Sequence, residues 1–453
     1  MTRALAKPLP LLLSLSLAGY LASAPVIPSR AADAETAPAT GIQPEYMDKT
    51  VSPCENFFEY ANGAWLKKTE IPADRPSWGV LNIINDKNLE LLRKLLEKAE
   101  STAAAEGSNE KKLGDLYFSG MNEKEIEAQG IKPLDEELQK IQAIDSLEAL
   151  RKETARLHQF GVEIFFVVSS GQDFKDSTRV IAQTEQGGLG LPDRDYYLEA
   201  DEDSKKTREQ YVAHMNKMFA LAGADKEKAS RDAETIMRIE TAFARASMKK
   251  EEMRNPEAVY HKMELKEVEA LTPHFSWKQY VSDIGFPDIS VINVGQPDFF
   301  KAMDHELATV SLDDWKTYLR WHLLNDAAPY LSSALVNEDF DFNGRILKGS
   351  KALLPRWKRV VEATNMTIGM ALGEQYVKAA FPPDAKEHAL ALVKRLKDQL
   401  RGDLETLDWM GPETRKQALK KLEAFGQKIG YPDKWRDYSA LKIDRQSYLW
   451  NVM

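Results

Sequence analysis

The sequence is poor in the residues that most catalytic sites need, beginning with cysteine. Cys54 is the only cysteine among 453 residues, so no disulfide can form within the chain. A reactive thiol is the functional alternative, but nothing near Cys54 in the sequence supplies the base or the positive charge that activates one. We therefore expect Cys54 to be a small, buried apolar residue.

Histidine is also scarce, and its spacing does not fit a metal site. None of the 7 histidines forms the i,i+4 pair that a zinc-binding HExxH helix requires. In the nearest approach, HELAT from His305 to Thr309, Thr309 takes the place of the second histidine. Neighbouring residues on a helix point about 100° apart, so we expect a helix turn at the solvent edge and no metal ligands. The histidines are His158, His214, His261, His274, His305, His322 and His388.

Nucleotide-binding and nucleophile motifs are missing as well. The chain contains no GxxxxGK[ST], no GxGxxG and no GxSxG. The glycine-rich stretch from Gly187 to Leu198 is therefore interpreted as a tight loop between a sheet and a helix. Acidic residues are abundant at 70, so the chance pair Asp313-Asp314 is better interpreted as the first turn of a helix. These motifs and residue spacings by themselves assign no catalytic residue.

Charge and hydropathy exclude two further classes of protein. The net charge of −9 argues against a nucleic-acid-binding surface. Past the N-terminus no apolar stretch is long enough to cross a membrane, and there is no internal repeat or heptad pattern. With 43% hydrophobic residues, a globular chain with a substantial core is expected.

The first 45 residues resemble an export signal followed by a tether. Arg3 and Lys7 precede an apolar run from Leu9 to Ala22, which is too short to span a bilayer comfortably, and small residues come after it. We expect a signal peptide over residues 1–31 and a flexible tether over residues 32–45, which is small, Pro-containing and unpatterned. The sequence therefore predicts an exported protein, periplasmic or extracellular, with no membrane span after signal removal.

The stretch from Ser52 to Leu89 is the most distinctive part of the remaining chain. It combines an aromatic cluster with Asn62-Gly63, which is typical of a turn. Apolar residues three or four apart from Trp78 to Leu96 then predict one face of a helix. An aromatic turn leading into a long helix is expected, with a partner for the aromatic rings to pack against.

Helical patterns dominate the rest of the chain, and the predicted fold is mainly α with a small β-hairpin insert. The hairpin is predicted at Val162–Ser170 and Thr178–Gln183, where β-branched and aromatic residues are bounded by glycine and polar turns. Ser290–Gly295 is also short and β-like. The predicted helical segments are Leu89–Ala104, Lys111–Ser119, Glu136–Phe160, Lys205–Glu252 (two or three helices), Tyr260–Leu271, Asp298–Leu307, Leu312–Tyr330, Lys351–Phe381, Lys386–Leu407 and Pro412–Ile429.

Five segments, in order along the chain, resemble the neprilysin family of zinc metalloendopeptidases. The first is FFEYANGAWL, which resembles the start of that family's mature ectodomain. Together the five span essentially Tyr46 to Tyr438. They are Phe57–Leu66, Leu116–Leu134 (LYFSGMNEKEIEAQGIKPL), Gly188–Leu198 (GLGLPDRDYYL), Arg254–Met263 (RNPEAVYHKM) and Leu407–Tyr438.

The resemblance implies a large multi-helix, two-lobed ectopeptidase whose central chamber admits oligopeptides. In the family, zinc is held by an HExxH helix and a distant glutamate, which would come after Met453. The family's substrate-binding Asn-Ala-Tyr segment is also absent. Residues 46–453 are therefore expected to form the family's N-terminal region: the chamber-forming lobe and the first elements of the catalytic lobe. No residue of this chain is assigned to catalysis or to metal binding.

The family also has two arginines, eight residues apart, implicated in holding a substrate's terminal carboxylate. Ser77 and Asn85 stand at those positions here, and Arg75 lies close to the first. A carboxylate clamp needs the guanidinium fork. Arg75, Ser77 and Asn85 are thus candidate peptide-binding residues, without a strong requirement for a free C-terminal carboxylate.

Two functional hypotheses remain open. In the first, the chain is the N-terminal part of a secreted zinc metalloendopeptidase, truncated and inactive alone because its zinc ligands are absent. In the second, it is a stand-alone, non-catalytic peptide-binding or scaffold protein derived from that family. The expected partners are oligopeptides and a missing C-terminal catalytic portion, and zinc is the cofactor expected of the full-length family.

Overall fold

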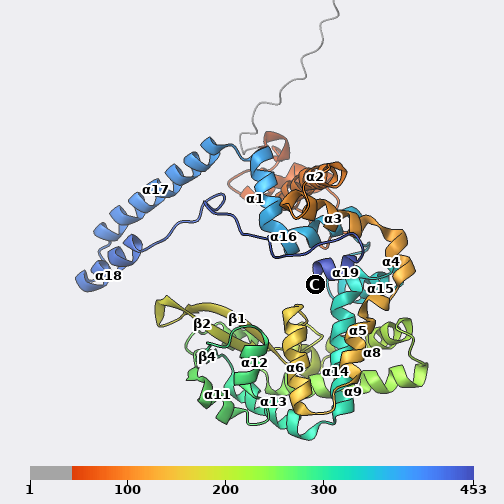
Figure 1. The fold of residues 1–453 in the computed structure, drawn as a ribbon. Helices are drawn as coiled ribbons and strands as arrows, with labels where there is room; N and C mark the ends of the chain where they lie inside the picture. The colour runs from red at the N-terminus through yellow and green to blue at the C-terminus, as the bar shows by residue number, and fades with distance from the viewer. Residues whose placement is uncertain (1–42) are drawn as a thin grey trace, which may run out of the picture. The chain divides into compact units, whose positions relative to one another are not determined.

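The computed structural model describes residues 43–453 (Figure 1). These residues form two compact units, which meet between Glu70 and Ile71 in the sequence, and each is considered on its own. The expected signal peptide, and all of the expected tether up to residue 42, lie outside the described residues. The tether's last residues meet a short 3-10 helix, η1 (Pro44–Tyr46).

The aromatic stretch of the first unit is a helix, so the turn predicted at Asn62-Gly63 is wrong. Helix α1 (Phe57–Lys68) runs through both residues. It begins because the Asn56 side chain accepts a hydrogen bond from Glu59 N at 3.1 Å. A Cβ added at Gly63 would lie 2.9 Å from Asp48 Cβ. The glycine therefore allows the segment around Asp48 to pack closely against α1.

Cys54 is exposed rather than buried, so the expectation of a buried residue is wrong. It lies in a turn where Glu55 N donates to Ser52 O at 3.0 Å. The turn precedes α1 and places the thiol at the surface of its unit.

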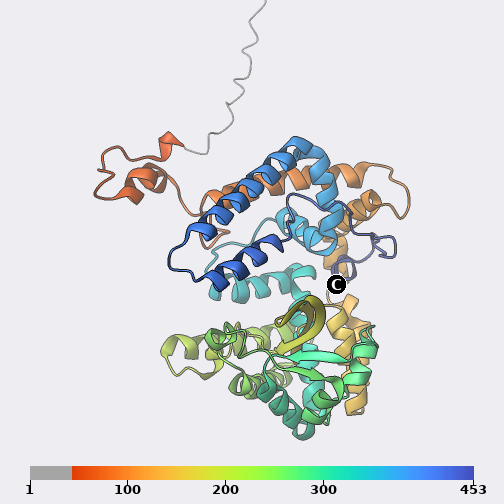
Figure 2. The same ribbon diagram turned by 90° about the vertical axis from the view of Figure 1, so that its left-hand side faces the viewer.

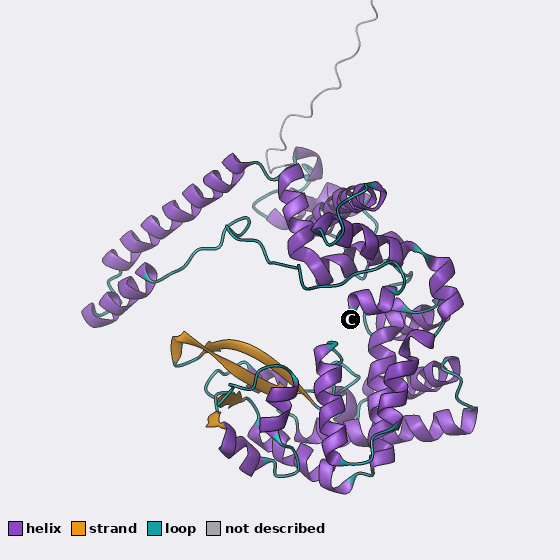
Figure 3. Ribbon diagram, viewed as in Figure 1, coloured by secondary structure: helices purple, strands orange, loops and turns teal. Residues whose placement is uncertain are grey.

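The second unit is built mostly of helices (Figure 3), which confirms the prediction of a mainly α fold. Its larger helices are α2 (Val80–Ser101), α3 (Asn109–Met121), α5 (Asp135–Gln142), α6 (Leu147–Gln159), α8 (Glu202–Leu221), α9 (Lys226–Ala246), α13 (Pro297–Thr309), α14 (Leu312–Ala327), α16 (Arg356–Ala380), α17 (Pro383–Thr406) and α18 (Pro412–Glu423). The shorter ones are α4 (Glu123–Gln129), η2 (Lys132–Leu134), α7 (Asp195–Leu198), α10 (Lys250–Met253), α11 (Leu265–Leu271), α12 (Trp277–Asp283), η3 (Ala328–Tyr330), α15 (Ser333–Asp339), the π-helix η4 (Phe340–Ile346) and α19 (Tyr448–Val452).

Helices α2, α3 and α16 pack around one of the unit's two hydrophobic cores. Leu89 and Leu96, seven residues apart on α2, are both buried there. A Cβ on Gly114 of α3 would lie 2.6 Å from Ala99 O, so glycine permits the close approach of α2 and α3. Residues near the C-terminus hold α3 in place, since Arg445 Nε donates to Asp115 Oδ1 at 2.7 Å.

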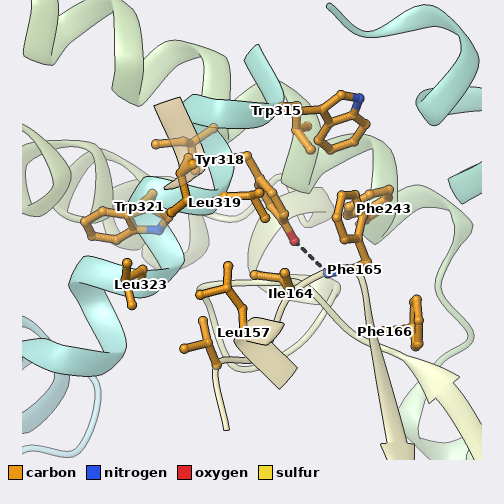
Figure 4. Packing of buried hydrophobic residues seen from close by; sticks show 14 of the residues in the cluster. Leu157, Ile164, Phe165, Phe166, Phe243, Trp315, Tyr318, Leu319, Trp321 and Leu323 are labelled. Atoms are coloured by element: carbon orange, nitrogen blue, oxygen red, sulfur yellow. Dashed lines mark hydrogen bonds between the residues drawn. The ribbon is translucent and has the colours of Figure 1, made fainter. Parts of the chain in front are cut away.

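The other core joins α5, α6, α8, α9, α13 and α14 to the sheet (Figure 4). Tyr318 on α14 is central to it: its hydroxyl accepts from Phe165 N at 3.1 Å and donates to Gly188 O at 2.9 Å. Phe165 has a φ of 54°, which is uncommon for an aromatic residue. The Tyr318 hydrogen bond satisfies its buried N–H and fixes the entry to the first strand.

The predicted hairpin is confirmed as part of a four-stranded sheet. Strands β1 (Phe166–Asp173) and β2 (Asp176–Gln186) pair antiparallel. The sheet order is β1-β2-β4-β3, with β4 (Val291–Val294) parallel to β2 and β3 (Lys262–Glu264) antiparallel to β4. The predicted β-like segment at Ser290–Gly295 thus contains β4.

Several predicted helices differ from the structure, among them Lys351–Phe381, whose helix α16 begins only at Arg356. Tyr260–Leu271 begins with strand β3, because Met263 pairs with Ile292 far along the chain. Glu136–Phe160 divides into α5 and α6, since the Ser146 hydroxyl accepts from Ala149 N at 3.2 Å and starts a new helix. Helix α18 ends at Glu423 instead of continuing to Ile429. The π-helix η4 was not predicted.

Helices α17 and α18 form a hairpin of neighbouring helices (Figures 1 and 2). No residue of α17 is buried, although its leucines recur at helical spacing. Leu392 and Leu396 are 59% and 61% exposed. The hairpin thus presents an apolar face to solvent. No helix within residues 43–453 combines the length and the apolar character needed to cross a membrane.

Candidate peptide-binding site

The three candidate peptide-binding residues lie at the start of α2. Ser77 is exposed in the loop that leads to the helix, and Asn85 is exposed within the helix. Arg75 is half-buried. Ser77 and Asn85 can therefore offer a hydroxyl and an amide to a ligand, whereas Arg75 is held by the protein itself.

Arg75 forms an ion pair with an aspartate of the same helix region. Its Nη2 donates to Asp86 Oδ1 at 2.8 Å, and its side chain is 14% exposed. Its backbone N donates to Pro72 O at 3.0 Å. Arg75 Nε is buried and has no hydrogen-bond partner among residues 43–453. The guanidinium is committed to Asp86 and is not a free carboxylate clamp.

Asp86 also connects α2 to α16. Its Oδ2 accepts from Lys358 Nζ at 2.7 Å, so one carboxylate bridges two cations. Glu362 lies one turn further along α16, and burial raises the pKa of its carboxyl above the ordinary value. This network fixes the start of α2 against α16.

Sequence reasoning missed Asp86, which pairs with Arg75, and Lys358, which pairs with Asp86 from α16. The available signal was the i,i+4 spacing of Lys358 and Glu362, which places both on one face of a helix. That spacing recurs by chance in a chain with 61 basic and 70 acidic residues. Only the pairing of α2 with α16 brings Asp86 to Lys358.

Apolar side chains accompany the two exposed polar residues. Leu81 is 80% exposed, and Val80 and Ile84 are also exposed. Val80 and Ile84 are four residues apart and lie on one face of α2. The start of α2 therefore offers apolar contacts, a hydroxyl and an amide, which suits an uncharged stretch of peptide better than a charged terminus.

The zinc ion that the family resemblance implies does not fit the residues described. Within residues 43–453, no three His, Cys, Asp or Glu side chains converge on a point that could hold a metal ion. His305 is exposed on α13, and Thr309 Oγ1 donates to its carbonyl at 2.9 Å. The predicted solvent-edge helix turn is confirmed there.

Two other stretches singled out in the sequence have structural roles. Asp313 and Asp314 occupy the first turn of α14, as predicted, where Asp314 N donates to the Ser311 hydroxyl at 3.2 Å. The glycine-rich stretch connects β2 to α7, also as predicted. Tyr197 at its end donates to the buried carboxylate of Glu240 at 2.8 Å. This hydrogen bond ties the loop to α9.

Comparison with known proteins places these features in context. Residues 53–432 match the model of peptidase family M13. Human endothelin-converting enzyme 1 is 32% identical over 401 residues, covering 85% of this chain and 51% of the enzyme. Neprilysin-3 of Drosophila melanogaster is 28% identical over 432 residues, covering 89% and 55%.

A solved structure is similar over nearly the same region. It is the zinc metalloprotease Zmp1 of Mycobacterium tuberculosis in complex with an inhibitor, with a TM-score of 0.86 and 36% identity. The match covers 91% of this chain and 62% of that one. The chain thus spans about half the length of the curated relatives it matches.

Proposed function

The chain belongs to peptidase family M13, and we propose that it forms the N-terminal, peptide-enclosing part of a zinc metalloendopeptidase that cleaves oligopeptides. The observation that carries the proposal is the family match over residues 53–432 together with the exposed start of α2. The matched relatives are about twice as long, and the zinc ligands are proposed to lie in the part of them that this chain does not match.

Ser77 and Asn85 are proposed to contact the substrate backbone, and Leu81 and Ile84 its apolar side chains. Arg75 contributes indirectly, because its pairing with Asp86 sets the direction in which α2 begins. With no free guanidinium at positions 77 and 85, the terminal carboxylate of a peptide gains little there. Internal stretches of peptide are therefore the proposed ligands.

A binding and hydrolysis assay on the purified chain tests this function. A panel of fluorescent oligopeptides is expected to bind without being cleaved, and metal analysis is expected to find no stoichiometric zinc. Cleavage that persists in a chelator would place an active site within the chain. Stoichiometric zinc would contradict the assignment of the ligands elsewhere, and a panel that fails to bind at all would overturn the peptide-handling role.

A second candidate function is that of a stand-alone, non-catalytic peptide-binding or scaffold protein. Residues 43–453 offer no converging metal ligands, which fits both candidates. The DNA after codon 453 decides between the two. A continuing frame that encodes HExxH supports the metalloendopeptidase, whereas a stop codon and then an unrelated gene support the stand-alone protein.

Export to the periplasm or the extracellular space is also proposed, on the strength of residues 1–31. Fusion of these residues to alkaline phosphatase, which is active only after export, provides the test. An active fusion is expected, and replacing Leu11, Leu12 and Leu13 by arginine should abolish its activity, because charge in the apolar run prevents recognition as a signal.

A further inference from the structure

Strand β1 lies at the edge of the sheet and carries no charged residue before its last position. It is eight residues long, and the sheet order leaves it paired only with β2. An edge strand carries a row of backbone donors and acceptors that can pair with another extended chain. Only the residues of β1 whose backbone groups point away from β2 can take part in such pairing.

The hydrogen bonds of β2 distinguish its two sides. Thr184 O accepts from Gly295 N at 2.8 Å, and Gln186 N donates to Gln296 Oε1 at 2.9 Å. Both atoms therefore point toward β4 and away from β1. Because the N–H and C=O of one residue point to the same side of a strand, Thr184 forms a non-hydrogen-bonded pair with its partner in β1.

The register then identifies the free groups of β1. Thr184 lies opposite Val168 and Ala182 opposite Ser170, so the backbone N–H and C=O of Val168 and Ser170 point away from β2. Among residues 43–453, no hydrogen bond outside the sheet involves these four groups. The next residue of the same parity, Gln172, is partly occupied, since Gln183 Nε2 donates to its carbonyl at 3.3 Å.

Most of the edge lacks the features that normally prevent pairing. Residues 166–172 contain no charged residue and no proline, whereas natural edge strands usually carry lysine, proline or a bulge along their length. The irregularity in the pairing of β1 with β2 lies at the end of the strand, between Gln172 and Asp173. The single charge of β1 is at its end: Asp173 is buried and accepts from Lys262 Nζ at 2.6 Å and Tyr260 Oη at 2.7 Å. These bonds fix the end of the strand, and the segment before it remains uncharged.

We propose that an extended oligopeptide adds to this sheet by pairing with β1 at Val168 and Ser170. The proposal rests on the peptide-handling function proposed above. It adds a second place where the peptide contacts the chain, through backbone pairing with a strand. An antiparallel peptide would exchange two hydrogen bonds with each of these residues. Because main-chain groups make the bonds, peptides of varied sequence can bind there. A second copy of this chain pairing edge to edge is the competing occupant.

Backbone changes in the ligand provide the sharpest test. The probe is the capped peptide acetyl-Thr-Val-Thr-Val-Thr-Lys-amide with a fluorescent label on the lysine, titrated into the full chain. N-methylation of its two valines or of its first two threonines blocks one side of the strand at a time. One of the two methylated probes is expected to bind at least tenfold more weakly, and the other within twofold of the parent.

Substitution in β1 locates the contact. Ser170→Pro removes an N–H that does not bond β2, so the hairpin should tolerate it, and binding of the parent probe should fall at least tenfold. Ser170→Ala keeps the N–H and should bind within twofold of the original chain. If Ser170→Pro lowers the melting temperature, the two methylated probes still test whether the peptide pairs with the chain along one side.

The outcomes separate this inference from the proposed function. Unchanged binding by Ser170→Pro, or equal loss with both methylated probes, overturns pairing at β1 while peptide handling stands. A chain that sediments as a dimer and becomes monomeric with Ser170→Pro shows that a second copy occupies the edge, which also overturns it. If neither this probe nor the wider panel binds, the proposed function itself fails.

Discussion

Gly190 and Tyr211 approach so closely that a Cβ on Gly190 would lie 1.8 Å from Tyr211 Oη. The hydroxyl cannot move freely, because it accepts from Trp321 Nε1 at 2.8 Å and donates to Glu240 Oε1 at 3.2 Å. The glycine-rich stretch thus owes at least one of its glycines to packing against a buried hydrogen-bond network.

Gly190→Ala is therefore expected to lower the free energy of unfolding by roughly 1–3 kcal/mol, the usual cost of overpacking a core. Urea denaturation monitored by circular dichroism measures the change. Gly426→Ala is the matched control, because nothing lies within 4 Å of a Cβ there, and it should be close to neutral. Equal stability of the two variants would contradict the packing role.

Asp86→Asn is expected to destabilise the chain by about 1–3 kcal/mol, because it leaves Arg75 and Lys358 beside an uncharged amide. All three side chains are less than a third exposed, so solvent screens the network only in part. Glu90→Gln, on the exposed face of the same helix, should change stability little. A double-mutant cycle with Lys358→Met should give a coupling free energy clearly above zero.

Glu153 gives stability an unusual dependence on pH. Its carboxyl is buried beside a cavity of about 440 Å³, and burial raises its pKa from 4.5 to about 7. The native state thus binds the proton more tightly than the unfolded chain. The stabilisation of the native state by this bound proton is fully present below pH 4.5 and is lost as the pH rises through 7.

Glu153→Gln should therefore raise the free energy of unfolding at pH 8 by about 3 kcal/mol, as the pKa difference requires, and change it little at pH 4. Chemical denaturation at both pH values measures this. Glu148→Gln, an exposed acid on the same helix, should show no such difference. A Glu153→Gln variant that is no more stable than the original chain at pH 8 would show that the carboxyl titrates normally.

Placing arginines at positions 77 and 85 tests the proposed substrate contact. The Ser77→Arg/Asn85→Arg variant is expected to bind peptides with a free C-terminal carboxylate about tenfold more tightly than their amides, or about 1.4 kcal/mol. The original chain should bind both forms within about twofold, because it has no bidentate partner at these positions.

Fluorescence anisotropy with matched acid and amide peptides gives the ratio. Ser77→Gln/Asn85→Gln, which adds length without charge, should not discriminate between the two peptides. A strong preference for the acid in the original chain would show that another cation, such as Arg75, already serves as the clamp.

Local patterns were sufficient for much of the fold. Helices α2, α3, α13 and α14 and the β1–β2 hairpin are predictable from periodicity and β-propensity within single segments. Strand β3 could not be found this way, because three residues become a strand only by pairing with β4. Gly63 was interpreted as a turn residue because Asn-Gly is typical of turns. Its actual role, the close contact with Asp48, depends on how the first unit folds and cannot be read from the local sequence.

The candidate site was likewise predictable only in part. Ser77 and Asn85 were located through resemblance to a family, and both are exposed, Ser77 in the loop before α2 and Asn85 within the helix. The network in which Asp86 accepts from both Arg75 and Lys358 was not predictable, since Asp86 and Lys358 are 272 positions apart in the sequence. The open edge of β1 likewise required the register of β2 against both of its neighbours.

The parallel pairing of β2 with β4 also imposes an order of events in time. A hairpin such as β1–β2 can form within about 1–10 μs, but Gln186 and Gln296 are 110 residues apart, and several helices intervene. Until β4 arrives, both edges of the hairpin are open. Because an open edge is a template for pairing with another chain, closure of the sheet by β4 also protects the hairpin from strand-to-strand aggregation.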